Sequence, residues 1–232
     1  MKKTTLVSLA TLLVLIPATL YLGTYLRGRW YYLTSTLVIL EAMAPFFLLF
    51  EARRPQAREL VILAVMAALA VAGRVAIPIP NFKAITGIVM ITGMAFGPQA
   101  GFMTGAISAV ASNFFYTQGP WTPWLMLSYG VGGFLAGMLF YGRQWKNLRT
   151  ELLIQTGFAF AAVVLVVGPL LDACTIFTTG AKFSWGFVFA VLAAGFPHNV
   201  IHGLFCAVTM LLLSKPLLAK LNRLKNKYGM LQ

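Results

Sequence analysis

Two amides and two tryptophans crowd the short stretch SNFFYTQGPWTPW inside an otherwise largely apolar chain. Asn113 and Gln118 each carry hydrogen-bond donors and acceptors, while Trp121 and Trp124 offer flat rings with one N–H donor each. Prolines on both sides of Trp121 limit the freedom of the turn. With the ring of Tyr116 added, the stretch suits the binding of a polar ligand. The alternative is an aromatic belt at a membrane interface, where Trp and Tyr are enriched in any case.

A second stretch, RVAIPIPNFKAITG, has a similar character. It offers Arg74, Asn81, Phe82 and Lys83 around two prolines that reduce the conformational entropy of the loop. If both stretches lie on the same side of a membrane, they form two preorganised loops facing one another. Together they predict a capped pocket whose walls carry amides, aromatic rings and positive charge.

A third motif, FPHNVIH, places two histidines four residues apart and therefore on one face of a helix. A metal or haem site at His198 and His202 is one interpretation, and an intramembrane enzyme that also uses Asp172 is its extension. Because no carboxylate or cysteine is positioned to complete a metal site, we prefer pocket lining by His198 and Asn199. His202, one turn deeper, is then a packed residue, and no catalytic or metal-binding residue is predicted.

The elements that must position these residues are membrane-spanning helices. The chain has 232 residues, of which 59% are hydrophobic and only 10% charged, and its apolar runs approach the roughly 20 residues that cross a bilayer. No two-residue alternation points to a β-barrel, so helices are favoured. We predict an all-α integral membrane protein with about eight spans: 5–26, 31–51, 58–79, 83–97, 99–116, 121–141, 150–172 and 185–214.

Positive charge follows the predicted topology. Of the 18 Lys and Arg residues, only five fall on one side of the membrane, namely Arg27, Arg29, Arg74, Lys83 and Lys182. Basic residues gather in the cytoplasm, so both termini are predicted to be cytoplasmic and the two binding loops external. The net charge of +13 is thereby explained without nucleic acid, and the basic tail KPLLAKLNRLKNKYG is interpreted as an anchor to membrane lipid.

The chain divides into a transmembrane hairpin with a basic linker, 1–56, and a six-helix substrate-binding core with the basic tail, 57–232. The first span is predicted to be retained rather than cleaved as a signal peptide. There is no GxxxxGK[ST] phosphate-binding loop, and the carboxylates away from the cytoplasmic ends of the predicted spans are Glu41 and Asp172. The chain is therefore poorly equipped to power transport by itself, although a gradient-driven carrier stays an alternative.

Small residues recur at four-residue spacing, which places them on one helix face and allows close backbone approach. Three glycine pairs follow this pattern and are predicted to pack inside the bundle: Gly93 with Gly97, Gly101 with Gly105, and Gly133 with Gly137. Ala64, Ala68 and Ala72 form a longer stripe. That stripe faces either its own bundle or another protein.

The stretch from Ala64 to about Gly137 resembles the substrate-binding S components of energy-coupling factor (ECF) vitamin transporters. The resemblance implies a six-helix membrane subunit that captures a vitamin from outside. It also implies that Ala64, Ala68 and Ala72 dock on a transmembrane T component, and that the loops around Asn81 and Trp121 are lids. The subunit then reorients on the T component to release the vitamin inside.

In that resemblance the chain binds no cofactor, and two partner ATPases use ATP with Mg²⁺ in a bacterial cell membrane. The PNFK and SNFF…QGPWTPW combination is most similar to the cobalamin-linked S component, so cobalamin (vitamin B12) or a related corrinoid is the expected substrate. The amides of Asn113, Gln118 and Asn199 would pair with corrin amides. Other large polar vitamins would fit nearly as well.

Overall fold

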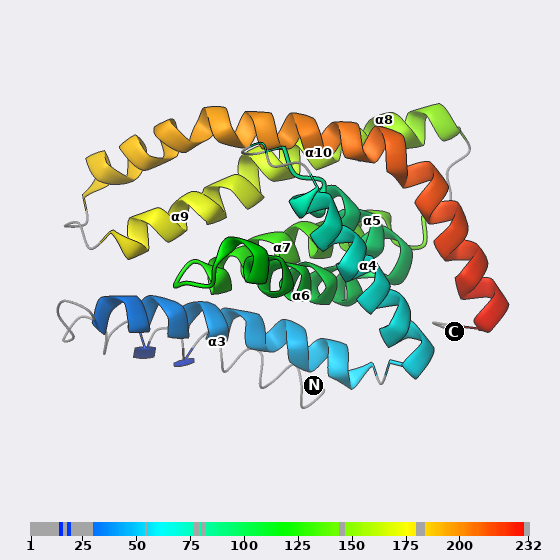
Figure 1. The fold of residues 1–232 in the computed structure, drawn as a ribbon, viewed down its shortest axis with the longest axis horizontal. Coiled ribbons are helices and arrows are strands. Elements are labelled where there is room, and N and C mark those ends of the chain that lie inside the picture. The colour runs from blue at the N-terminus through cyan, green and yellow to red at the C-terminus, as the bar shows by residue number, and fades with distance from the viewer. Residues whose placement is uncertain are drawn as a thin grey trace.

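The computed structural model describes residues 14–15, 18–19, 30–53, 55–76, 79, 82–143, 147–179 and 184–229. Within these residues the chain is helical and contains no strand. The helices run α3 (Trp30–Ala52), α4 (Ala57–Val75), α5 (Ile85–Phe96), α6 (Pro98–Tyr116), α7 (Thr122–Phe140), α8 (Leu148–Ala162), α9 (Gly168–Thr178) and α10 (Trp185–Tyr228), as Figure 1 shows. A π-helical segment, Val163–Val167, joins α8 to α9 without a break.

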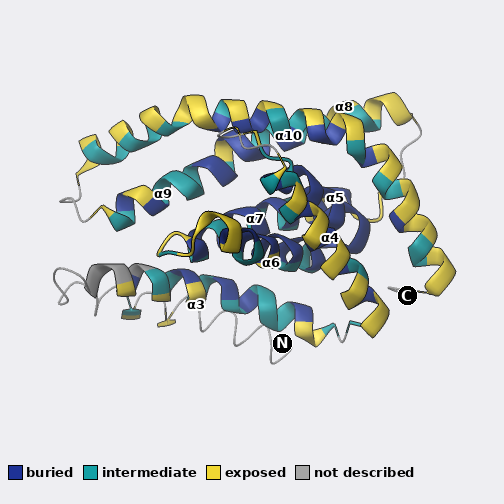
Figure 2. Cartoon of the chain, in the orientation of Figure 1, coloured by how far each residue is buried: buried dark blue, intermediate teal, exposed yellow. Residues whose placement is uncertain are grey.

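Helices α5, α6 and α7 form the centre of the bundle, and all twelve residues of α5 are buried (Figure 2). Only Gly97, at a φ of 94° that favours glycine, separates α5 from α6. A Cβ on Gly133 would lie 2.5 Å from the carbonyl oxygen of Gly101, and one on Gly93 would lie 2.1 Å from that of Gly133. These and similar contacts confirm the predicted close packing for Gly93, Gly101, Gly105, Gly133 and Gly137, whereas Gly97 forms the turn between α5 and α6.

Helix α3 lies along the outside of this centre and contacts α6, α7 and α9. Phe46 stacks on Phe102 with a ring-centroid distance of 4.1 Å and meets Phe134 edge-on at 5.0 Å. Glu41, on the same helix, accepts a hydrogen bond of 2.7 Å from Thr19. The division of the chain at residues 56 and 57 stays a prediction.

Helix α10 continues to Tyr228, beyond the predicted end at residue 214, and contains both Pro197 and Pro216. Its C-terminal part changes direction and runs past the end of α5 (Figure 1). Leu221 is only 5% exposed and belongs to the main hydrophobic core, and Lys225 Nζ donates to the Tyr141 hydroxyl at 3.1 Å. The basic tail is therefore a helix with an apolar side against the bundle.

The last seven of the eight predicted spans each coincide with a helix of the described chain, and 5–26 lies almost entirely outside the described residues. By length and hydropathy, three described helices are sufficient to cross a membrane: Thr122–Phe140, Leu148–Thr178 and Trp185–Tyr228. Helix α4 carries three charged residues, Arg58, Glu59 and Arg74, and α5 has only twelve residues. The helical membrane class is established, and the count of eight spans stays a prediction.

The two ends of the bundle differ in charge. Arg53 pairs with Glu59, Arg58 lies over the Tyr228 ring, and Lys225 reaches Tyr141, so the basic linker and the basic tail meet at one end. At the opposite end, which holds the turn between α6 and α7, the described basic side chains are Arg74 and Lys83. This arrangement agrees with the charge asymmetry from which the orientation is predicted.

Candidate substrate-binding site

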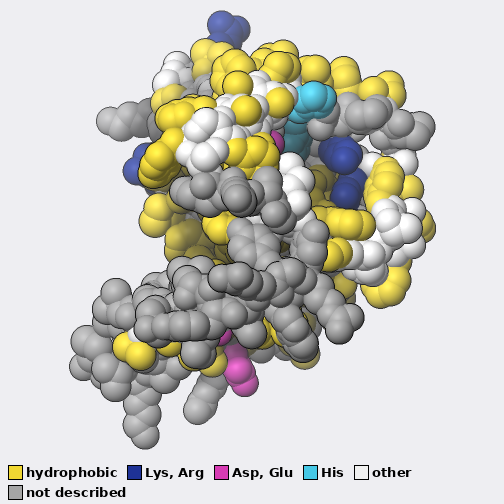
Figure 3. All heavy atoms as spheres, turned by 90° about the vertical axis from the view of Figure 1, so that its left-hand side faces the viewer, with side chains coloured by type: hydrophobic (Ala, Val, Ile, Leu, Met, Phe, Trp, Pro, Cys, Tyr) yellow, Lys and Arg dark blue, Asp and Glu magenta, His cyan; other side chains and the backbone are white. Residues whose placement is uncertain are grey.

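A cavity of about 270 Å³ opens at the less basic end of the bundle. Four elements supply its walls: the loop before α5, the first half of α7, α9 and the middle of α10. The lining residues are Lys83, Trp121, Trp124, Leu125, Tyr129, Leu171, Cys174, Thr175 and His202. Figure 3 shows this end, with histidine and Lys or Arg side chains side by side on a mainly hydrophobic face.

Two tryptophans from the start of α7 line the cavity in different ways. Trp121 is 44% exposed and lies over Gly119, where a Cβ would come within 2.4 Å of its ring. Trp124 is buried and stacks on Phe177 of α9 with a centroid distance of 5.4 Å. Its indole Nε1 has no hydrogen-bond partner among the described residues. A buried donor without a partner is costly, which makes the Nε1 of this cavity-lining residue a candidate to donate to a ligand.

Asn113 acts within the protein rather than at the cavity wall. Its Oδ1 accepts a 2.9 Å hydrogen bond from Arg74 Nη1, and its Nδ2 donates to Thr122 Oγ1 at 2.9 Å. Arg74 Nη1 also donates to the Ser112 hydroxyl, and Arg74 is only 5% exposed. These contacts join the C-terminal ends of α4 and α6 to the start of α7.

Gln118 shapes the turn between α6 and α7. Its Nε2 donates to the Val110 carbonyl at 3.0 Å, and its Oε1 accepts from Thr122 Oγ1 at 3.0 Å. The backbone N–H of Gly119 also reaches Thr122 Oγ1 at 3.2 Å. Thr117, at a φ of 75°, gives the turn its direction. The polar residues of this stretch thus fix the loop that carries Trp121.

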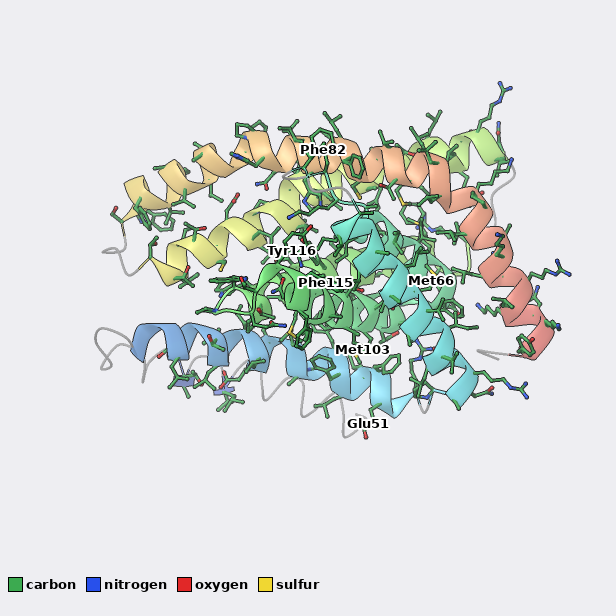
Figure 4. All side chains as sticks on the ribbon, viewed as in Figure 1. Glu51, Met66, Phe82, Met103, Phe115 and Tyr116 are labelled. Atoms are coloured by element: carbon green, nitrogen blue, oxygen red, sulfur yellow. The ribbon has the colours of Figure 1, made fainter. Side chains whose placement is uncertain are left out.

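Two cations face one aromatic ring beside the cavity. The guanidinium of Arg74 lies 4.9 Å from the centroid of Tyr116, and Lys83 Nζ lies 5.7 Å from it. The Tyr116 hydroxyl donates to the Arg74 carbonyl at 2.9 Å, and Figure 4 shows Tyr116 at the end of α6. Neither cation forms an ion pair with a carboxylate of the described chain. Burial, together with the neighbouring charge of Arg74, lowers the pKa of Lys83.

His202 lies deeper in the cavity than the tryptophans. Its Nε2 is 3.0 Å from Thr86 Oγ1, and its ring meets Tyr129 edge-on with a centroid distance of 6.4 Å. Both His202 and Tyr129 are buried and line the cavity. The structure therefore places His202, rather than His198, at the cavity wall.

The other predicted residues of FPHNVIH lie against α9 or face outward. Asn199 Nδ2 donates to Asp172 Oδ2 at 2.7 Å, so its amide joins α10 to α9. His198 is exposed, and its Nδ1 lies 3.3 Å from the Ala194 carbonyl. Among the described residues, no three His, Cys, Asp or Glu side chains come together in a way that could hold a metal ion.

Three further predictions concern the first loop and the alanine stripe. Asn81 lies outside the described residues, and Phe82 meets Phe205 of α10 at 5.4 Å (Figure 4). The alanine stripe is exposed on the side of α4 opposite its buried residues; its members are Ala64, Ala68 and Ala72. The stripe is therefore free of its own bundle, and docking stays a prediction.

Several residues that line the cavity were not among the predicted site residues. Tyr129 and Thr175 are polar side chains in apolar runs, a signal that marks functional positions inside membranes. Leu125, Leu171 and Cys174 carry no such signal, because apolar wall residues look like any other lipid-facing or packed position. Thr122 does not line the cavity but holds the turn through Asn113 and Gln118, a role that a threonine in this sequence gives no sign of.

Comparison with known proteins was informative in one case. The model of the family described as the ECF-type riboflavin transporter, S component, matches residues 55–219. This chain belongs to that family. The match covers well over half of the 232 residues and includes every residue that lines the cavity. No curated protein and no solved structure matches the chain.

Membership in this S-component family makes the chain a substrate-binding subunit of an ECF transporter and implies association with a T component and ATPases. The cobalamin-specific assignment is not confirmed, because the matching family is the riboflavin type. The resemblance detected in the sequence therefore holds at the level of the S component.

Proposed function

We propose that this S component captures a flat heteroaromatic vitamin, with riboflavin the first expectation, in the cavity between α7, α9 and α10. The observation that carries the proposal is the unpartnered indole N–H of buried Trp124 at the wall of a cavity of about 270 Å³. Trp121, partly exposed beside it, offers an aromatic face on which a flat ring system stacks.

The polar groups around the cavity match the edge of a flavin. The carbonyl oxygens and ring nitrogens of an isoalloxazine accept hydrogen bonds, and Trp124 Nε1 and the Lys83 ammonium are donors at the cavity wall. The hydroxyl of Thr175 and the imidazole of His202 are available for the hydroxyls of a ribityl chain. When the lid loops close over an uncharged ligand with several acceptors, both Trp124 Nε1 and the Lys83 ammonium find a hydrogen-bond partner.

Size favours a flavin over a corrinoid. The cavity lies near the lower end of the range for small-ligand sites, roughly 300–1,000 Å³. A corrinoid is several times larger than a flavin and needs both lid loops far apart. In addition, the amides of Asn113 and Asn199, expected to pair with corrin amides, make hydrogen bonds within the protein.

The partners follow from the same proposal. The cavity end faces outward and the basic end faces the cytoplasm, so both termini lie on the cytoplasmic side of a bacterial cell membrane. The T component docks on the exposed stripe of Ala64, Ala68 and Ala72, where small side chains permit close helix approach. Two partner ATPases supply the energy from ATP with Mg²⁺, and the subunit releases its vitamin after reorienting on the T component.

Equilibrium binding to the purified full chain tests the proposal. Riboflavin is titrated first, with its fluorescence quenching by the tryptophans as the signal, followed by cobalamin and other B vitamins by calorimetry. We expect riboflavin to bind without ATP or partners and cobalamin to bind at least roughly a hundred-fold more weakly, a difference near 3 kcal/mol. Tight cobalamin binding would reinstate the corrinoid assignment, and no binding of any vitamin would overturn the proposal.

A further inference from the structure

A second hollow lies at the basic end of the bundle, opposite the end that holds the substrate cavity. It consists of two adjoining cavities of about 530 and 210 Å³ between α8 and the C-terminal part of α10. The two cavities share four lining residues: Glu151, Gln155, Leu218 and Asn222. We call the combined hollow the α8–α10 groove.

The groove is amphipathic. Leu148, Leu152 and Leu218 give the larger cavity an apolar wall, and Tyr141 and Gly142 border the smaller one. The same two helices carry exposed leucines outside the groove, with Leu153 68% exposed on α8 and Leu212 68% exposed on α10. In a membrane protein such side chains face hydrocarbon, so the helices that border the groove are in contact with lipid.

Positive charge rims the groove without a matching number of carboxylates. Arg149 and Lys215 line the larger cavity, while Arg143 and Lys225 line the smaller one. The acidic lining residue is Glu151, and its Oε1 accepts a 2.9 Å hydrogen bond from Gln155 rather than an ion pair. The rim therefore carries four cations against one carboxylate and attracts an anion.

Ser214 supplies an independent indication of a ligand. It lines the larger cavity, is only 1% exposed, and its hydroxyl has no hydrogen-bond partner among the described residues. Buried hydroxyls are normally paired, because an unmade hydrogen bond costs free energy. An acceptor oxygen within the groove would satisfy it.

We propose that the α8–α10 groove binds the phosphate headgroup of an anionic phospholipid, with an acyl chain along its apolar wall. Basic pockets between helices on the cytoplasmic side of a membrane suit this chemistry. Helix α4 contributes no residue to the groove, so the lipid site and the alanine stripe use separate surfaces. The bound lipid fastens the C-terminal part of α10 to α8 while the subunit is embedded in the membrane.

The test uses the purified, delipidated full chain with three additions: short-chain phosphatidylglycerol, short-chain phosphatidylcholine and inorganic phosphate. Titration followed by thermal unfolding and calorimetry gives affinity and stabilisation for each. We expect phosphatidylglycerol to bind roughly ten-fold or more tightly than phosphatidylcholine. Equal affinity of the two lipids would overturn the proposal. Equal stabilisation by inorganic phosphate would also overturn it, because the site would then recognise a free anion.

Matched variants locate the site. Arg149→Gln with Lys215→Gln removes two rim cations, and Lys220→Gln with Arg223→Gln removes two exposed cations that do not line the groove. The first pair is expected to weaken phosphatidylglycerol binding roughly ten-fold or more, and the second to leave it unchanged. Ser214→Ala should weaken binding without lowering the melting temperature of the lipid-free protein. If both pairs of substitutions weaken phosphatidylglycerol binding equally, the groove is not the binding site.

Discussion

The guanidinium of Arg74 and the side-chain amide of Asn113 are joined by a 2.9 Å hydrogen bond between the ends of α4 and α6. Both residues are buried, and Asn113 passes the connection on to Thr122 at the start of α7. Two loops that are separate in sequence are thereby held as one unit. The amides of Asn113 and Gln118 hold the α6–α7 turn in place, and Trp121 and Trp124 line the cavity beside it.

Asn113→Ala is therefore expected to reduce stability more than affinity. The change leaves a buried Arg74 N–H and the Thr122 hydroxyl with one partner fewer, at a cost of about 1–3 kcal/mol. Thermal unfolding and ligand titration on the same preparation separate the two effects. Gln118→Ala, which also removes two internal hydrogen bonds, should behave in the same way. A large loss of affinity at an unchanged melting temperature would show instead that Asn113 and Gln118 contact the ligand directly.

The tryptophans are expected to show the opposite behaviour. Trp124→Phe removes the unpartnered Nε1 donor and keeps an aromatic ring against Phe177. It should weaken vitamin binding by about 1–3 kcal/mol, or roughly five-fold to more than a hundred-fold, with little change in melting temperature. Trp121→Ala should also lower affinity, by removing a stacking face.

Phe115→Ala is the matched control for Trp121→Ala, because Phe115 is 69% exposed at the same end of the bundle and does not line the cavity (Figure 4). Its affinity should equal that of the parent protein. If Trp121→Ala and Phe115→Ala lower affinity equally, Trp121 belongs to an interface belt and not to the site.

The sequence identified the helices well and the site only in part. Apolar runs set the helix positions from residue 31 onward, and glycine spacing correctly indicated the packed centre around Gly133. Helix spacing alone could not decide between His198 and His202, because both share one helix face; in the structure His198 is exposed, whereas His202 is buried beside Thr86. Likewise, an amide in a loop has the same pattern whether it binds a ligand or, like Asn113, a buried arginine.

Gly133→Ala is expected to destabilise the bundle strongly. The added Cβ would lie 2.5 Å from the Gly101 carbonyl oxygen and 2.7 Å from its carbonyl carbon, and backbone atoms have no alternative rotamer. Overpacking of this kind costs typically about 1–3 kcal/mol. Gly157→Ala is the control, since a Cβ there meets no heavy atom within 4 Å and alanine favours the helix by up to about 1 kcal/mol. Melting temperatures should therefore fall in the first variant and hold or rise in the second.

Bulk on the alanine stripe is expected to block transport while leaving vitamin binding intact. Ala64→Leu with Ala68→Leu adds volume to an exposed face on which close helix approach is proposed. Ala190→Leu with Ala194→Leu makes the same change on exposed positions of α10 and should leave uptake unaffected. Uptake in cells containing the complete transporter, together with pull-down of the T component, measures the effect. Normal uptake by the stripe variant would remove α4 from the docking surface.

Lys83 is expected to give the folded protein a specific dependence on pH. Burial and the neighbouring charge of Arg74 lower its pKa in the folded state below the ordinary value for lysine. Between the folded and unfolded pKa values the unfolded chain binds more protons, so stability rises with pH in that window.

Lys83→Met removes the contribution, and Lys83→Arg retains a charge throughout. The melting temperature of the parent protein should therefore rise relative to Lys83→Met as the pH increases from 7 towards about 10, where ordinary lysines titrate. Because the remaining lysines titrate equally in both proteins, the difference isolates Lys83. A constant difference across this range would show that folding does not lower the pKa of Lys83 and would contradict the effect of its burial beside Arg74.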